Sequence, residues 1–107
     1  MINFNEYQKK AITTAVYPKI YQISYPALGL AEEAGEVAGK IKKMMRDGIP
    51  LAEQKEKIEA EMGDVLWYLA NLAHDCGISL TEVANKNIDK VRDRQQRGQL
   101  HGEGDVR

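Results

Sequence analysis

The chain has little of what small proteins use for covalent stability or membrane anchoring. Cys76 is the single cysteine among 107 residues, which excludes an intrachain disulfide and a zinc site built from several cysteines. We interpret it as a small apolar residue near a helix end, in a reducing compartment. No window approaches the roughly 20 apolar residues of a membrane span, and the N-terminus lacks the features of a signal peptide. We therefore expect a soluble, cytoplasmic protein without a membrane partner.

The chain also lacks an excess of charge of one sign. Fifteen Lys and Arg residues stand against sixteen Asp and Glu residues, for a formal net charge of −1. Non-specific binding to DNA or RNA depends on a basic electrostatic field, so we expect no polymeric nucleic acid as a partner. A chain of this length forms one domain with a modest core, and an extended active site could require a second subunit.

Prolines are few and no run of alternating β-branched residues is present, which favours helices throughout. Turn signals predict helices over about 5–17, 26–47, 51–76 and 80–97. The predicted caps are Asn5 with Gln8 for the first helix and Ser79 with Glu82 for the last, while Gly77 ends the third. The expected fold is an all-α, four-helix bundle-like subunit formed by a single domain over 1–98. Residues 99–107 are expected to form a polar, mobile tail.

A short carboxylate motif occurs twice, as Glu33-Ala34-Gly35-Glu36 and as Glu61-Met62-Gly63-Asp64. On a helix, residues three apart lie on one face, about 5–6 Å apart at Cβ, so each motif presents two carboxylates that repel one another unless a cation lies between them. The short 46–51 connection indicates antiparallel packing, which lets the two pairs meet. Four oxygen donors predict a site for Mg²⁺, with Mn²⁺ as a substitute.

The acids allow two other interpretations, of which one stays open and the other is disfavoured. The acids could form an exposed stripe paired with lysines, because Lys40 follows Glu36 by four residues and Lys57 precedes Glu61 by four. A di-iron bundle is disfavoured, because it needs Glu-x-x-His pairs and neither His74 nor His101 follows a glutamate by three residues.

The last predicted helix carries a basic ridge. Cations of this kind neutralise charge on the oxygens of a leaving phosphate. The candidate phosphate-binding residues are Lys86, Asn87, Lys90 and Arg94, with Arg97 continuing the ridge. The alternative is a solvated basic face balanced by Asp89 and Asp93.

Aromatic residues are scarce, and their positions suggest two roles. Tyr21, Tyr25 and Tyr68 are candidates for a pocket that stacks on a base, although packing in a core or interface is the alternative for each. The region around Trp67 is apolar on almost every side, and a helix of that kind must be buried all round. We therefore predict that Trp67 packs against another subunit and that the protein is a homodimer or a dimer of dimers (a homotetramer).

Taken together, Glu32-Glu33-x-x-Glu36 and Glu61-x-x-Asp64, with 24 intervening residues, resemble the MazG-like branch of the all-α nucleoside triphosphate pyrophosphohydrolase superfamily. The similarity covers about residues 28–97. It implies Mg²⁺-dependent attack of water on a nucleoside or deoxynucleoside triphosphate, which releases the monophosphate and pyrophosphate. The resemblance also implies that the metal ligands are Glu33, Glu36, Glu61 and Asp64.

For the residue that takes the proton from water, Glu33 is the first candidate and Glu32 the second. Three other functions stay open. The chain could be a phosphoribosyl-ATP pyrophosphohydrolase, a helical relative with similar acidic motifs. It could also be a non-catalytic helical interaction module, or a regulator that binds nucleotide without turnover.

Overall fold

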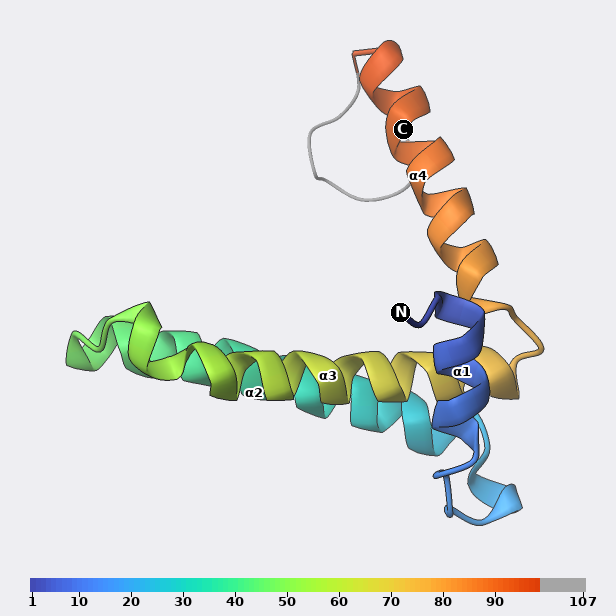
Figure 1. Cartoon of the computed structure of the whole chain (residues 1–107), viewed down its shortest axis with the longest axis horizontal. Helices are drawn as coiled ribbons and strands as arrows, with labels where there is room; N and C mark the ends of the chain where they lie inside the picture. Colours follow the sequence, from blue (N-terminus) through green and yellow to red (C-terminus); the bar gives the residue numbers. More distant parts are fainter. Residues whose placement is uncertain (99–107) are drawn as a thin grey trace.

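In the computed structural model, residues 1–98 are described and form helices joined by short connections (Figure 1). The elements are α1 (Phe4–Ile12), the short 3₁₀ turn η1 (Lys19–Tyr21), α2 (Ser24–Asp47), α3 (Leu51–Asp75) and α4 (Leu80–Gln96). No strand occurs within these residues, so the predicted all-α class is confirmed. The predicted tail, 99–107, lies outside the described residues.

Most helix ends coincide with the predicted turn signals. Gly48 and Gly77 take positive φ angles of 66° and 72° where α2 and α3 end, a conformation that glycine adopts without steric cost. The Ser79 side chain accepts a hydrogen bond from the Glu82 amide and caps α4 as predicted. The connection between α2 and α3 is short, so these two long helices fold back on each other as a hairpin (Figure 1).

The first helix differs from its prediction at both ends. Its cap is Asn3, whose side chain accepts from the Glu6 amide at 2.9 Å, and not Asn5. The helix also ends earlier, at Ile12, where the hydroxyls of Thr13 and Thr14 donate to the carbonyls three residues before them. Hydroxyl groups of this kind compete with the helical hydrogen-bond pattern, which explains the early end.

Gln8 is buried, although the sequence analysis assigned it to a helix cap. Its Nε2 donates to the carbonyls of Ala70 at 3.2 Å and Ile78 at 3.0 Å, and its Oε1 accepts from the Leu80 amide at 3.1 Å. These three bonds satisfy backbone groups around the turn between α3 and α4. Gln8 therefore attaches α1 to that turn.

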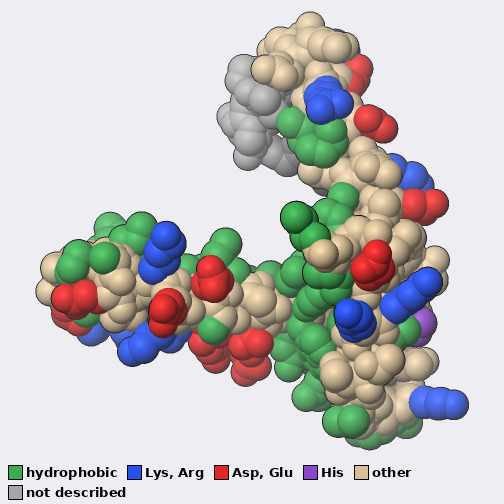
Figure 2. All heavy atoms as spheres, in the orientation of Figure 1, with side chains coloured by type: hydrophobic (Ala, Val, Ile, Leu, Met, Phe, Trp, Pro, Cys, Tyr) green, Lys and Arg blue, Asp and Glu red, His purple; other side chains and the backbone are tan. Residues whose placement is uncertain are grey.

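The buried core is small and lies where α1 crosses α3. Its centre is formed by Ala11, Ala70 and Leu80, and the partly buried residues packed against it are Tyr7, Leu66, Trp67 and Leu69. Figure 2 shows hydrophobic side chains gathered at the corner where the hairpin, α1 and α4 meet. Most of the hairpin beyond this corner is exposed or only half-buried.

Trp67 has contacts within the chain, and its packing against another subunit stays a prediction. Its ring packs against the core cluster beside α1, and its Nε1 donates to Thr14 Oγ1 at 2.8 Å. On this side α3 packs against α1.

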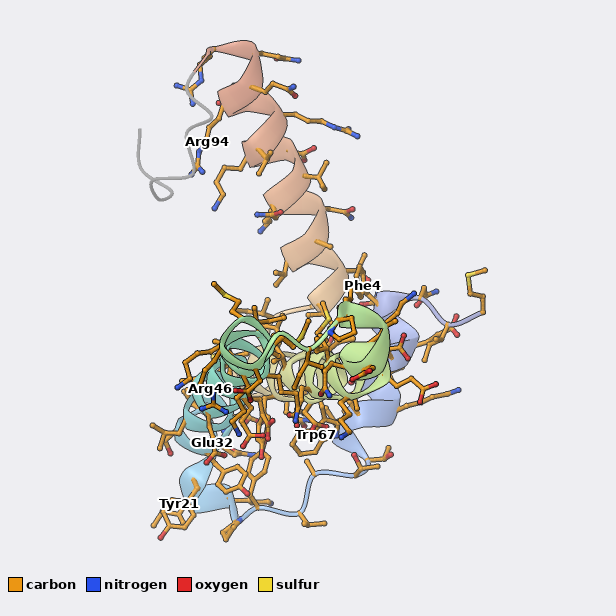
Figure 3. The ribbon with its side chains drawn as sticks, turned by 90° about the vertical axis from the view of Figure 1, so that its left-hand side faces the viewer. Phe4, Tyr21, Glu32, Arg46, Trp67 and Arg94 are labelled. Atoms are coloured by element: carbon orange, nitrogen blue, oxygen red, sulfur yellow. The ribbon has the colours of Figure 1, made fainter. Side chains whose placement is uncertain are left out.

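The four helices do not lie together as a closed bundle in one chain. Figure 1 shows α4 leaving the turn after α3 and extending away from the hairpin, and the chain measures 43 × 43 × 30 Å along its principal axes. Figure 3 shows Arg94 on α4 well away from Glu32 on α2. The basic ridge of α4 therefore does not face the acidic motifs of its own chain. Among the described residues, no helix combines the length and hydropathy needed to cross a membrane.

Candidate metal centre

The hairpin brings the two acidic motifs together near the middle of its length. Glu33 and Glu36 belong to α2, and Glu61 and Asp64 belong to α3. One carboxylate oxygen from each of Glu33, Glu61 and Asp64 lies within 4.8 Å of the others. Glu36 is not part of this triad, but its charge is among those that raise the pKa of Glu33. We call Glu33, Glu61 and Asp64 the acidic triad.

Burial within the triad leaves two oxygen atoms unsatisfied. Glu33 Oε2 and Glu61 Oε2 are inaccessible to solvent and have no hydrogen-bond partner. The pKa of Glu33 is raised to about 7, chiefly by burial, then by a hydrogen bond with Glu61 and by the charges of Glu36, Asp64 and Glu61. Buried carboxylate oxygens that repel one another destabilise the folded state unless a cation binds between them. Oxygen donors at this spacing fit a hard divalent cation.

One lysine reaches the triad. Lys40 Nζ lies 3.7 Å from Glu61 Oε1, and both side chains are partly buried. This pair bridges the two helices, whereas the alternative interpretation of the acids paired Lys40 with Glu36 along one helix. A single cation cannot neutralise several carboxylates, so the triad keeps an excess of negative charge.

A pocket of about 230 Å³ adjoins the triad on the side toward the chain's N-terminal connector. It is lined by Tyr25, Leu28, Gly29, Glu32 and Tyr68. The structure thus groups Glu32 with two of the three tyrosines predicted to form a base pocket. The third, Tyr21, belongs to η1 and is exposed (Figure 3). Glu32 is not part of the acidic triad.

Two tyrosine rings line this pocket, Tyr25 and Tyr68, and Tyr17 supports Tyr25 from outside the pocket. Tyr17 stacks on Tyr25 with centroids 4.9 Å apart, and Tyr25 lies 6.3 Å from Tyr68 at a 45° tilt. The pKa of Tyr68 is raised by burial first, then by the neighbouring Tyr25 and by the charges of Glu33 and Glu32. This electrostatic influence places the aromatic wall directly beside the acidic residues.

Asp75 and Gly29 support the wall, and the sequence analysis missed both. Asp75 Oδ2 accepts from the Tyr17 hydroxyl at 2.9 Å and from the Ile23 amide at 3.0 Å. Ile23 has a positive φ of 70°, which is unusual for a β-branched residue. The hydrogen bond from its amide to Asp75 helps to hold this conformation. A Cβ on Gly29 would overlap the Tyr68 ring, so the glycine lets that ring lie against α2. The unexplained glycine within a helical pattern was the available signal.

The hairpin also carries an apolar groove between α2 and α3. The groove has a volume of about 350 Å³. Its lining comes from both helices, and consists of Ala34, Val37, Met62, Val65, Leu66 and Leu69. Within the described chain they face one another across an open groove and not a closed core.

Comparison with known proteins agrees with this arrangement. The chain matches the MazG nucleotide pyrophosphohydrolase domain over residues 24–98, a region that begins with α2 and includes the acidic triad, the pocket and α4. The chain belongs to this family, as its motifs indicated. It is 41% identical over 109 residues to the Gene 37 protein of Mycobacterium phage L5, an alignment that covers 94% of this chain and 96% of the relative. No solved structure gives a significant match.

Proposed function

We propose that the protein is a Mg²⁺-dependent nucleoside triphosphate pyrophosphohydrolase, which hydrolyses an NTP or dNTP to the monophosphate and pyrophosphate. The observation that carries the proposal is the acidic triad, with its two buried and unpartnered oxygens, in a chain of the MazG family. A cluster of this kind costs stability in the fold, and its benefit lies in binding a cation.

The residues that would hold Mg²⁺, or Mn²⁺ in its place, are Glu33, Glu61 and Asp64, with Glu36 beside them. When bound, such an ion supplies Lewis acidity, charge neutralisation for the phosphates and a lower pKa for an attacking water. Lys40, already paired with Glu61, adds one positive charge at the edge of the triad.

Glu33 is the residue that we propose to accept the proton from the attacking water. Its Oε2 is a buried acceptor without a partner, so it has a free lone pair for that proton. Glu32, the second candidate, lines the neighbouring pocket and is better placed to contact another part of the substrate.

The phosphate-binding role of Lys86, Asn87, Lys90 and Arg94 requires an assembly, because α4 extends away from the triad of its own chain (Figure 1). We propose a homodimer or homotetramer in which α4 of one subunit approaches the triad of another. The open apolar groove on the hairpin and the exposed apolar residues Val83 and Ile88 on α4 support this. Burial of these surfaces would supply the driving force.

The test is a panel of NTPs, dNTPs and phosphoribosyl-ATP, incubated with the purified protein and Mg²⁺ and analysed for phosphorus products. We expect monophosphate and pyrophosphate from ordinary nucleotides, and no turnover in EDTA. Glu36→Gln and Asp64→Asn should abolish turnover while circular dichroism stays unchanged. Inorganic phosphate as the product, or full activity in both variants, would refute the proposal. Turnover of phosphoribosyl-ATP alone would assign the related activity, and binding without products would indicate a regulator.

A further inference from the structure

We propose that the pocket formed by Tyr25, Leu28, Gly29, Glu32 and Tyr68 binds the nucleobase, and that Glu32 makes it select bases that carry an amino group over thymine and uracil. This inference rests on the proposed function, because it assumes a nucleotide whose phosphates lie at the acidic triad. It adds a substrate class and a residue that determines specificity.

The pocket has the right position relative to the triad. Glu32 directly precedes Glu33 on α2, and Tyr68 follows Asp64 by one helical turn on α3. Residues four apart on a helix lie about 5–6 Å apart at Cβ, so the aromatic wall begins one step from the metal-binding carboxylate. A ligand that places its phosphates at the triad can therefore reach the pocket with its base.

The walls of the pocket suit a flat aromatic ligand. Two aromatic rings, Tyr25 and Tyr68, line it, and Leu28, which is 73% exposed, adds an apolar edge that a ligand could cover. The Tyr17 ring stacked on Tyr25 and the absence of a Cβ at Gly29 fix where these rings lie. Bases stack on aromatic side chains with little regard to sequence, so the rings bind a base without identifying it.

Identification needs a polar group, and Glu32 is the charged residue in the pocket lining. Within residues 1–98 its side chain makes no hydrogen bond or salt bridge, so its oxygens are available to a ligand. An ionised carboxylate is only an acceptor, and it pairs with N–H donors such as the amino group of cytosine, adenine or guanine. In thymine and uracil the N–H donor of the pairing edge, N3–H, lies between two carbonyl oxygens, and these acceptors repel a carboxylate that approaches it.

The experiment measures base preference separately from turnover. The single tryptophan, Trp67, lies edge-on to Tyr68 with centroids 5.0 Å apart, so its fluorescence can report a base stacked on that ring. Dissociation constants for dCTP, dATP, dGTP and dTTP would be determined with Ca²⁺ in place of Mg²⁺, and kcat/KM with Mg²⁺. The variants are Glu32→Gln and, as a matched control, Glu59→Gln, an exposed acid on α3 outside the pocket.

We expect the wild-type protein to bind each amino-bearing nucleotide at least about tenfold more tightly than dTTP, the size expected for a hydrogen bond to a charged group. Glu32→Gln should remove most of this preference, because an amide can donate to the thymine carbonyl, whereas Glu59→Gln should keep it. Equal wild-type affinities for all four nucleotides would overturn the inference. An equal loss of kcat/KM for every nucleotide in Glu32→Gln would also overturn it, because that result would indicate a role in the chemical step.

The two proposals fail in different ways. Base preference in binding without release of pyrophosphate would refute the hydrolase and keep the assignment of Glu32. Release of pyrophosphate from all nucleotides at equal kcat/KM would support the hydrolase and refute the assignment of Glu32. Circular dichroism of both variants checks that the helices are intact.

Discussion

Glu33 on α2 and Glu61 on α3 face each other across the hairpin, and each holds one carboxylate oxygen away from solvent without a hydrogen-bond partner. Burial first, then a hydrogen bond with Glu61 and the charges of the neighbouring carboxylates, raise the pKa of Glu33 to about 7. The metal-free fold therefore carries a local cost at the point where the proposed chemistry occurs.

Mg²⁺ should stabilise the protein through the acidic triad. Binding to the folded state alone adds about 2.7 kcal/mol when the free ion is at about 100 times its Kd. Asp64→Asn removes one member of the triad, and it should lower Mg²⁺ affinity by about ten- to a hundredfold. The melting temperature of metal-free Asp64→Asn should equal or exceed that of the wild type, since one repelling charge is gone. Thermal denaturation with and without Mg²⁺ measures both effects, and an undiminished Mg²⁺ response in the variant would contradict the ligand assignment.

The stability of the metal-free protein should fall as the pH rises from about 4.5 to about 7. The pKa of Glu33 is higher in the folded state, at about 7, than its ordinary value of 4.5, so the folded state binds a proton that the unfolded state releases. This contribution is complete at low pH and is lost as the pH passes the folded-state value. Urea denaturation across this range is the measurement. Glu33→Gln should remove this component of the pH dependence, and an unchanged profile in that variant would contradict the assignment.

Gly29→Ala should destabilise the protein by about 1–3 kcal/mol, because its Cβ would overlap the Tyr68 ring and force that ring to move. Nucleotide binding should weaken as well. The matched control is Gly39→Ala on the same helix, where an added Cβ meets nothing within 4 Å and alanine should stabilise the helix by up to about 1 kcal/mol. Chemical denaturation distinguishes the two, and equal effects at both positions would show that the ring is not held by this contact.

Val65→Asp should dissociate the proposed assembly, because it places a charge in the apolar groove. The sedimentation coefficient should fall from that of a dimer or tetramer to that of a monomer. Val16→Asp is the control, since Val16 is 92% exposed and lies outside the groove. A wild-type protein that sediments as a monomer would remove the basis for an active site completed by a second subunit.

The sequence was sufficient to predict the features that depend on local chemistry. Gly48, Gly77 and Ser79 mark helix ends because their conformations or side chains satisfy backbone groups nearby. The spacing of the acids predicted the meeting of three of the four, because helical geometry and a short connection leave the hairpin few alternatives.

Features that depend on contacts between distant residues were not predictable in this way. Asn3 and Asn5 are both suitable caps, and Asn5 instead accepts a hydrogen bond from Ser79. The role of Gln8 required knowing that α1 crosses the turn before α4. The direction of α4 and the fit of Tyr68 against Gly29 likewise follow from packing that no helical period encodes.

A single carboxylate oxygen, Asp75 Oδ2, ties the connector between α1 and α2 to the last turn of α3. Through Tyr17 and Ile23 it sets how the chain enters α2, and thereby the position of the Tyr25 ring. Insertions or exchanges in the connector can thus reshape what the neighbouring recess accepts without touching the carboxylates of the hairpin. The proposed base selectivity and the proposed hydrolysis therefore depend on different parts of this small fold.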